Sequence, residues 1–525
     1  MIHHPTRRAI LSMIGAAAGT SAMYAAMTAL GHAAESPWKG PIRLDGDPKG
    51  ARVLILGAGL AGMAAALELR AAGYQVEILE YRDKAGGRCW TLHSGDTYTE
   101  MGGFTQKVDF AEGNYINPGP WRIPYNHHAL LDYCRRLGVP LEPFIQKNHN
   151  AYLHSSRAFD GKPMRFREIE TDFRGNVSEL LAKAVRAGTL DEALSPADRE
   201  VLMASLKYFG ALDDEFDYRK GNHSSEYRGW AKWPGGGADA RPEPSDPLDF
   251  AAVLQSKLWN KLVDSDLVEF QETMFQPVGG MDRIAVGFEK QVGDLIKYNC
   301  KVTEIRQDDS GVTVTYVGSD GAGEPRTAAA DWCLCTIPFS ILSQIDADLS
   351  PEMKGVVDAT PYAESVKFGL EFKRRFWEQD EAIYGGITYT DLPIALISYP
   401  STGYQSDGPA VLLGGYAWES NANQFAAMSP EERIKWAVEF GARIHPQYPQ
   451  EFKTGVSVVW HRVPWTLGCY ALWREREANY DKATKIDGRI LMAGEHVSYL
   501  PGWQEGAILS ALDAISRLHD RVING

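Results

Sequence analysis

Three glycines, Gly57, Gly59 and Gly62, lie between an apolar run at 53–56 and a stretch with a helical pattern. In such a unit the first glycine permits a tight turn, the second lets the backbone approach a pyrophosphate, and the third lets the helix pack against the strand. Glu80 closes the next apolar run, where an acid can accept hydrogen bonds from the ribose of an adenosine. The pattern predicts a dinucleotide-binding unit whose contacts also include Ala58, Leu60 and Ala61.

A glycine pair and an arginine follow this unit directly. Gly86 and Gly87 allow main chain to lie against the pyrophosphate, and Arg88 brings a fixed cation to it. This segment resembles the second fingerprint of FAD enzymes of the amine oxidase and glutathione reductase type. Near the C-terminus, a strand pattern at 489–493 leads into a Gly-Glu pair and then a helix, which resembles the last FAD motif of the same family. The resemblance implies cofactor contacts at Gly87, Arg88, Gly494, Glu495, Gly502, Trp503 and Ala507.

Residues 117–127 read Asn-Pro-Gly-Pro-Trp-Arg-Ile-Pro-Tyr-Asn-His and precede an amphipathic helix pattern. They closely resemble the Gly-Pro-Met-Arg-Leu-Pro motif of L-amino acid oxidases, in which the arginine binds the substrate carboxylate. The resemblance implies this role for Arg122. One departure is the segment 100–106, which stands where the family often carries the arginine motif and indicates an insertion. By the same resemblance, further flavin contacts are expected at Gly103, Gly119, Pro120, Trp121, Arg122 and Val302.

The resemblance also implies a substrate end of the site. Lys367 matches the lysine that holds a water against flavin N5 and supports the reaction of reduced flavin with oxygen. Tyr416 matches the tyrosine whose hydroxyl completes the carboxylate clamp, while Trp503 and Tyr470 fall where monoamine oxidases place two aromatic rings beside the amine. Cys469 stands at the position of covalent flavin attachment in monoamine oxidases. L-Amino acid oxidases generally bind FAD noncovalently, and noncovalent FAD is the expectation here.

These motifs identify the chain as a member of the flavin amine oxidase family, most similar to the FAD-dependent L-amino acid oxidases. The implied reaction converts an L-amino acid, O2 and water to a 2-oxo acid, ammonia and hydrogen peroxide. Three alternatives stay open: oxidative decarboxylation to an amide, as in tryptophan 2-monooxygenase; a monoamine or polyamine oxidase; and a dehydrogenase that passes electrons to a quinone. Arg122 disfavours amines that lack a carboxylate. A redox-silent binding subunit would have lost residues that this chain keeps, and no cysteine spacing indicates a metal site.

The elements that position these residues predict an α/β fold. A Rossmann-like FAD-binding domain of the glutathione reductase type is expected from 45–118, 268–340 and 456–525. Short strands alternating with turns and helices predict a mixed-sheet substrate domain from 119–164 and 341–455. Helical patterns between residues 165 and 267 predict a helical insertion domain, in which glycine and proline at 233–244 indicate a loop.

The termini and composition bear on location and partners. Residues 1–34 carry Arg7-Arg8, a weakly apolar stretch and small residues at Ala33 and Ala34, a pattern typical of a cleaved twin-arginine export signal; an uncleaved anchor is the alternative. The signal predicts a twin-arginine translocase partner and a periplasmic or secreted protein, which we expect to be a homodimer. Because such substrates fold in a reducing compartment, the six cysteines are expected to be mostly free and buried. The net charge of −14 argues against nucleic acid as a partner.

Overall fold

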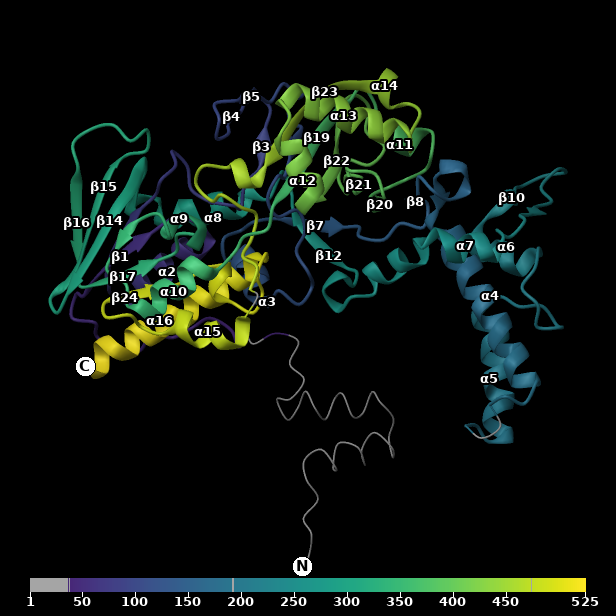
Figure 1. Ribbon diagram of the computed structural model, residues 1–525, viewed down its shortest axis with the longest axis horizontal. Helices are drawn as coiled ribbons and strands as arrows, with labels where there is room; N and C mark the ends of the chain where they lie inside the picture. The colour runs from purple at the N-terminus through teal and green to yellow at the C-terminus, as the bar shows by residue number, and fades with distance from the viewer. Residues whose placement is uncertain (1–35, 37, 191–192, 474) are drawn as a thin grey trace, which may run out of the picture.

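The computed structural model describes residue 36 and residues 38–190, 193–473 and 475–525; the predicted export signal lies outside them. A parallel sheet with the strand order β13-β2-β1-β17-β24 organises one side of the molecule (Figure 1). Its strands are β1 (Arg52–Leu56), β2 (Gln75–Leu79), β13 (Ile296–Lys297), β17 (Trp332–Cys335) and β24 (Ile490–Met492). Because these strands come from three distant stretches of the chain, the sheet joins its two ends.

Two long helices pack against each other beside this sheet. Helix α2 (Leu60–Ala71) contacts both α16 (Gln504–Asn524) and α8 (Asp282–Val292). The side chains of Ala64, Ala65 and Ala66 in α2 are fully buried, and their small size lets the neighbouring helix approach closely. The packing brings the N-terminal ends of α2 and α16 to the same cavity.

A second, four-stranded sheet of order β16-β15-β14-β18 covers the far side of the parallel sheet (Figure 1). It consists of β14 (Cys300–Asp308), β15 (Gly311–Gly318), β16 (Arg326–Ala330) and β18 (Asp346–Ala347). Helices α9 (Phe339–Leu342), α10 (Pro351–Ala359) and α15 (Arg476–Thr484) share a buried hydrophobic cluster with it, whereas η4 (Gly293–Leu295) contacts α8 and β2. Val302, expected at the adenine, belongs to β14.

The other half of the body is a seven-stranded sheet of order β23-β19-β22-β21-β20-β8-β9. Its pairs are antiparallel except for β20 and β8, so the sheet is mixed and the predicted α/β class is confirmed. The strands are β8 (Tyr152–His154), β9 (Met164–Arg165), β19 (Ser365–Phe372), β20 (Ile387–Thr390), β21 (Leu396–Ser398), β22 (Ala410–Trp418) and β23 (Phe452–Val459). Four helices pack near them: α11 (Phe376–Gln379), α12 (Glu419–Ala426), α13 (Pro430–Ala442) and α14 (Tyr448–Glu451). The register of β19 and β22 places Lys367 directly opposite Tyr416.

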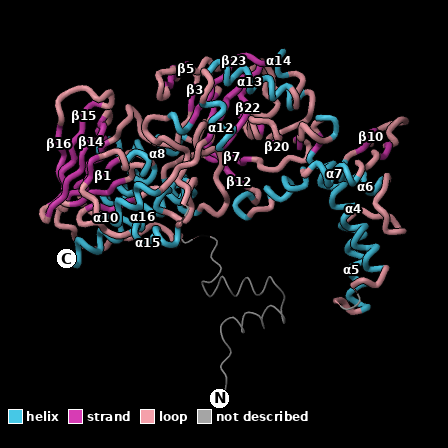
Figure 2. Tube along the Cα trace, viewed as in Figure 1, coloured by secondary structure: helices cyan, strands magenta, loops and turns pink. Residues whose placement is uncertain are grey.

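Short strand pairs connect the two halves (Figure 2). They are β3 (Leu92–His93) with β6 (Tyr115–Ile116), β4 (Thr97–Thr99) with β5 (Thr105–Lys107), and β7 (Leu141–Phe144) with β12 (Met274–Pro277). Glu100 at the turn of the β4–β5 hairpin forms a fully buried ion pair with Arg433 of α13 at 2.7 Å, and Arg462 lies 3.0 Å from the same oxygen. The segment 100–106, expected as an insertion, is thus anchored to the sheet of the second half. Helix α3 (His128–Arg136) follows the arginine motif.

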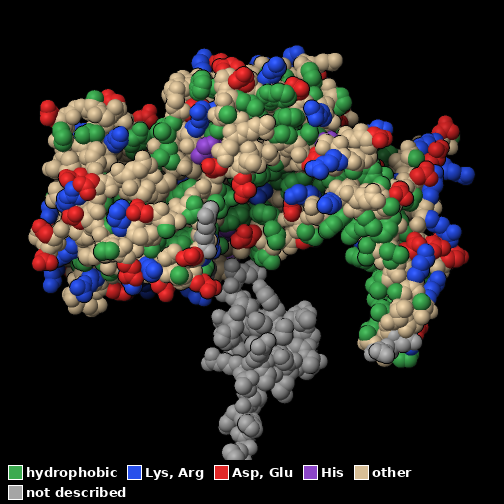
Figure 3. Space-filling model, viewed as in Figure 1, with side chains coloured by type: hydrophobic (Ala, Val, Ile, Leu, Met, Phe, Trp, Pro, Cys, Tyr) green, Lys and Arg blue, Asp and Glu red, His purple; other side chains and the backbone are tan. Residues whose placement is uncertain are grey.

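A helical arm projects from the body (Figures 1 and 3). It contains α4 (Phe166–Arg186), α5 (Pro196–Phe209), α6 (Asn222–Arg228), the ribbon β10 (Trp230–Lys232) with β11 (Glu243–Pro244), α7 (Phe250–Ser256) and η2 (Leu258–Ser265). A buried ion pair between Arg228 and Asp172, at 2.9 Å, holds α6 to α4. The chain returns to the body through η3 (Val268–Phe270). The short turns η1 (Phe159–Gly161), η5 (Trp460–Arg462) and η6 (Glu495–Val497) complete the elements. Within the described ranges, no helix is long and apolar enough to cross a membrane.

Candidate active site

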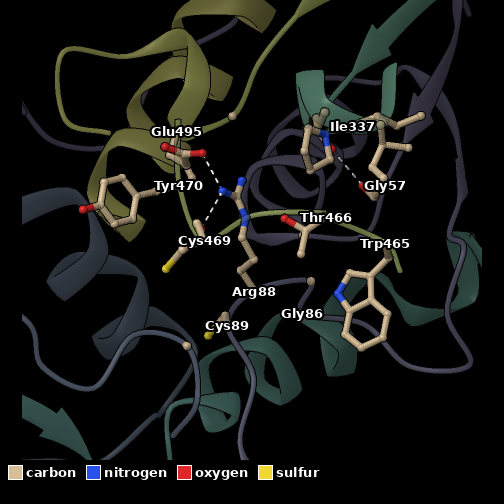
Figure 4. A pocket seen from close by; sticks show the side chains of 18 of the residues that line it. Gly57, Gly86, Arg88, Cys89, Ile337, Trp465, Thr466, Cys469, Tyr470 and Glu495 are labelled. Carbon is tan, nitrogen blue, oxygen red and sulfur yellow. Dashed lines mark hydrogen bonds and ion pairs between the residues drawn. The ribbon is translucent and has the colours of Figure 1, made fainter. Parts of the chain in front are cut away.

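A cavity of about 940 Å³ runs between the two halves of the body. Figure 4 shows how segments from both chain ends converge on it. The predicted residues that line it are Gly57, Gly59, Leu60, Ala61, Glu80, Gly87, Arg88, Gly119, Pro120, Trp121, Arg122, Val302, Lys367, Tyr416, Tyr470, Gly494, Glu495, Gly502, Trp503 and Ala507. Three predicted residues lie outside this lining. Ala58 and Gly62 are buried behind it, and Gly103 lies in an exposed turn of the β4–β5 hairpin.

At one end of the cavity the glycine turn has the geometry that its sequence predicts. Gly57 has a φ of +102°, and a Cβ on Gly62 would lie 2.1 Å from the carbonyl oxygen of Gly57, so only glycine fits against the strand. The carboxylate of Glu80 accepts hydrogen bonds from the backbone N–H of Ala58 at 2.6 Å and of Arg82 at 2.9 Å. Burial raises the pKa of Glu80, while these two N–H groups lower it.

In the middle of the cavity an ion pair joins the two ends of the chain. Arg88 donates to Glu495 at 2.5 Å and to the carbonyl oxygen of Cys469 at 3.2 Å, as the dashed lines in Figure 4 indicate. Glu495 also accepts from the backbone N–H of Gly502 at 2.9 Å. Burial alone would raise the pKa of this carboxyl, but the charge of Arg88 keeps it below its usual value. The pair therefore stays ionised and fixes the start of α16 against the glycine pair.

The opposite end of the cavity contains Lys367. Its Nζ donates to the carbonyl oxygen of Gly119 at 2.5 Å and lies 3.4 Å from that of Asn117. The ammonium faces the rings of Trp121 at 4.8 Å and Tyr416 at 4.5 Å. Because it is buried and forms no ion pair with any residue that the structure describes, desolvation lowers the pKa of Lys367 to about 7. A modest change in its surroundings would therefore change its charge near neutral pH.

Arg122 is the second cation at this end. Its Nη1 donates to Oε1 of Gln146 at 2.7 Å, and its guanidinium lies 4.3 Å from the ring centroid of Phe270 and 4.9 Å from that of Trp121. Its Nε is buried without a hydrogen-bond partner, and among the described residues no carboxylate lies within 4.0 Å of it. Burial accordingly lowers the pKa of Arg122 to about 10. The guanidinium thus has no ion pair among the described residues, and the more distant carboxylate of Glu269 only partly offsets the effect of burial on its pKa.

Three aromatic side chains surround this end. Trp503, the residue before α16, packs edge to face against His127 at 5.0 Å and lies 6.3 Å from the ring of Phe270. Tyr470 packs over Gly502. The hydroxyl of Tyr416 points to Sγ of Cys469, 3.9 Å away, and makes no hydrogen bond to Arg122. The tyrosine that the structure connects to Arg122 is Tyr389, whose hydroxyl lies 3.4 Å from Nε2 of Gln146.

Sequence reasoning did not find Gln146, Tyr389 or Phe270. Gln146 is 1% exposed, although glutamine is usually a surface residue, but burial is not visible in a single sequence. Phe270 reaches Arg122 from η3, after the whole helical arm. The only sequence signal was the position of Tyr389 in the segment 385–393, which resembles the family without identifying a role for the tyrosine.

The residues of the cavity fit an FAD. The N-terminal turns of α2 and α16 both open onto it, and neither Gly59 nor Trp503 caps its helix with a side chain. Free N–H groups at helix N-termini favour a phosphate anion. The glycine turn and Glu80 would hold the adenosine, Arg88 and the glycine pair the pyrophosphate, and Glu495 and the start of α16 the flavin part. The roles of individual residues toward the cofactor stay predictions.

Comparisons with known proteins agree with this geometry. A family model described as flavin containing amine oxidoreductase matches residues 60–518, so the chain belongs to this family, and the family prediction and its flavin are confirmed. It is 28% identical to an L-amino-acid oxidase of Siganus canaliculatus over 488 residues, which cover 90% of this chain and 86% of the relative. It is 26% identical to an L-amino-acid oxidase of Vipera ammodytes ammodytes, with 88% and 91% covered. A putrescine oxidase with bound putrescine has a TM-score of 0.57 at 19% identity, with 90% and 99% covered, which shows a shared fold.

Proposed function

We propose that this chain is an FAD-dependent L-amino acid oxidase. It converts an L-amino acid, O2 and water to a 2-oxo acid, ammonia and hydrogen peroxide. The observation that carries the proposal is the enclosed guanidinium of Arg122 at one end of the cavity, for which the described residues provide an amide as hydrogen-bond partner and no ion pair. A buried cation without an anion is costly, and a substrate carboxylate in a bidentate pair supplies that anion.

The residues at this end position the substrate. Arg122 fixes the carboxylate, and the rings of Trp503 and Tyr470 form walls that guide the amine and exclude water. The bound flavin supplies the oxidation, accepting the electrons from the substrate and passing them to O2. The ammonium of Lys367 is a cation near the proposed flavin position, where negative charge develops while oxygen is reduced. In this scheme the two cations have separate tasks, one toward the substrate and one toward oxygen.

Two other reactions use the same family fold. An amine oxidase, such as the putrescine oxidase with the shared fold, would leave Arg122 without an anion, which the burial of the guanidinium disfavours. Oxidative decarboxylation to an amide needs the same carboxylate clamp, so Arg122 favours neither outcome over the other. The reaction products distinguish oxidative deamination from oxidative decarboxylation.

We propose that FAD is bound noncovalently. We also propose that a twin-arginine translocase exports the protein to the periplasm or medium, and that the protein is a homodimer. The motif Arg7-Arg8 supports export. Burial raises the pKa of Cys469 and keeps its thiol protonated, which disfavours covalent attachment of the flavin to this residue. Fractionation of cells that express the wild type or the Arg7→Lys, Arg8→Lys double variant tests the export. Equal cytoplasmic retention of both would contradict it.

The substrate class is tested by comparing kcat/KM for an L-amino acid with that for the amine of identical side chain, for example L-phenylalanine and 2-phenylethylamine. Peroxide release is measured for both. The proposal expects a preference of at least about 30-fold for the amino acid, because loss of the pair with Arg122 costs about 2–5 kcal/mol. Equal efficiency for both compounds would make the chain an amine oxidase.

A further inference from the structure

The hydrogen-bond partner of Arg122 is a neutral side chain, and this distinguishes Arg122 from three buried arginines of the described chain. Arg228, Arg375 and Arg433 are each at most 4% exposed, and each pairs with a carboxylate at 2.6–2.9 Å. Arg122 instead donates to the amide of Gln146 at 2.7 Å. These three guanidinium groups are thus neutralised within the fold, whereas Arg122, like the buried Arg82 that donates to the carbonyl oxygen of Gly87, has no ion pair among the described residues.

We propose that Gln146 is a positioning residue that sets the preference of the site for a carboxylate. It orients the guanidinium of Arg122 by a hydrogen bond without neutralising its charge. This inference rests on the proposed function, because it assigns the free charge to a substrate carboxylate.

The hydrogen-bond inventory fixes the orientation of the Gln146 amide. A guanidinium only donates, so the atom that faces Arg122 must be the amide oxygen, which the 2.7 Å contact to Oε1 satisfies. The NH2 group of Gln146 then points to the hydroxyl of Tyr389, 3.4 Å away. That hydroxyl accepts, which leaves its own proton free to donate to another group. The hydrogen-bonded series of Arg122, Gln146 and Tyr389 therefore has a free donor at each end.

The location of Gln146 makes the orientation rigid. The side chain is 1% exposed and follows strand β7, whose partner β12 begins soon after Phe270. Phe270 covers the guanidinium at 4.3 Å from the other side. A carboxylate in place of the amide would have the same shape and would form an internal ion pair with Arg122. The substrate carboxylate would then have to compete with it for the guanidinium, in a buried place where such pairs are strong.

The test uses Gln146→Glu and Gln146→Leu in the FAD-loaded full chain. Binding of benzoate, a carboxylate without an amine, is followed by the change in flavin absorbance, and kcat/KM is measured for L-phenylalanine and 2-phenylethylamine. Gln106→Glu is the matched control, because Gln106 is also buried but bonds to the backbone of Ser457. Thermal unfolding reports folding of each variant.

We expect Gln146→Glu to weaken benzoate binding at least tenfold at pH 8 and to lower the preference for the amino acid by a similar factor. Gln146→Leu should raise KM for the amino acid more than it lowers kcat, since the cation is kept but loses its orientation. Gln106→Glu should leave the preference unchanged.

Unchanged benzoate binding in folded Gln146→Glu and Gln146→Leu would overturn the role of Gln146. An equal loss in Gln106→Glu would overturn it as well, because the effect would then be general to buried glutamines. Failure of the proposed function is distinguishable, because the wild type would then bind benzoate weakly and oxidise the amine as efficiently as the amino acid.

Discussion

Replacement of Arg122 removes a cation that has no ion pair among the described residues. Phe270 and Trp121 enclose the guanidinium, whose hydrogen-bond partner among the described residues is the amide of Gln146, and we propose that a substrate carboxylate is its counter-ion. Truncating one partner of such a pair costs about 2–5 kcal/mol, and each 1.36 kcal/mol is tenfold in rate. Arg122→Ala should therefore lower kcat/KM for an L-amino acid by roughly 30-fold to 5000-fold. Arg122→Lys should recover only part, because an ammonium does not form the bidentate pair.

The assay compares two substrates in each variant. Steady-state peroxide release is measured with L-phenylalanine and with 2-phenylethylamine, and Arg135→Ala, which alters an arginine side chain that is 80% exposed, serves as the control. Oxidation of the amine should be unaffected or faster in Arg122→Ala, since the amine loses an unfavourable neighbouring cation. A loss of equal size for both substrates would refute the reasoning, because Arg122 would then organise the site rather than bind the carboxylate.

Three further predictions concern the oxygen site, the flavin and the fold. Lys367→Met should slow reoxidation of the reduced enzyme far more than its anaerobic reduction in stopped-flow mixing. Because the pKa of Lys367 is about 7, its ammonium is lost as the pH rises through that value. The oxygen reaction of the wild type should therefore slow over the same pH range, and the variant should lack this pH dependence. Equal slowing of both half-reactions would contradict the assignment. Acid precipitation should release intact FAD from the wild type and from Cys469→Ser alike, whereas flavin retained in the wild-type pellet alone would demonstrate attachment. Glu100→Gln should lower the free energy of unfolding by about 3–5 kcal/mol, because it leaves Arg433 buried without its carboxylate; denaturant unfolding with exposed Glu112→Gln as control measures this, and a change as small as the control's would contradict it.

The cofactor end of the site could be predicted because its signals are local. The turn at Gly57 needs a positive φ and Gly62 needs the absence of a Cβ, so a few adjacent residues carry the information. Arg88 and Glu495 could be predicted individually through the motifs that contain them. The two residues are 407 positions apart in the chain, and they meet because the parallel sheet brings the two chain ends together.

The substrate end was predictable only in part, because its contacts are tertiary. Arg122 and Lys367 stand in recognisable segments, whereas Gln146 and Phe270 meet at Arg122 through the pairing of β7 with β12, across the whole helical arm. Tyr389 is brought near by the pairing of β20 with β8. Register between distant strands does not follow from the residues of either strand alone, so these three positions were missed.

The product stoichiometry tests the central claim most directly. Purified, FAD-loaded protein is supplied with an L-amino acid and O2, and hydrogen peroxide, ammonia, the 2-oxo acid, the amide and CO2 are measured in one reaction with catalase absent. Peroxide added to the 2-oxo acid alone gives the correction for nonenzymatic decarboxylation. An L-amino acid oxidase yields one peroxide, one ammonia and one 2-oxo acid for each amino acid consumed. Amide and CO2 as the principal products, with little peroxide or ammonia, would contradict the oxidase assignment and make the chain a decarboxylating monooxygenase.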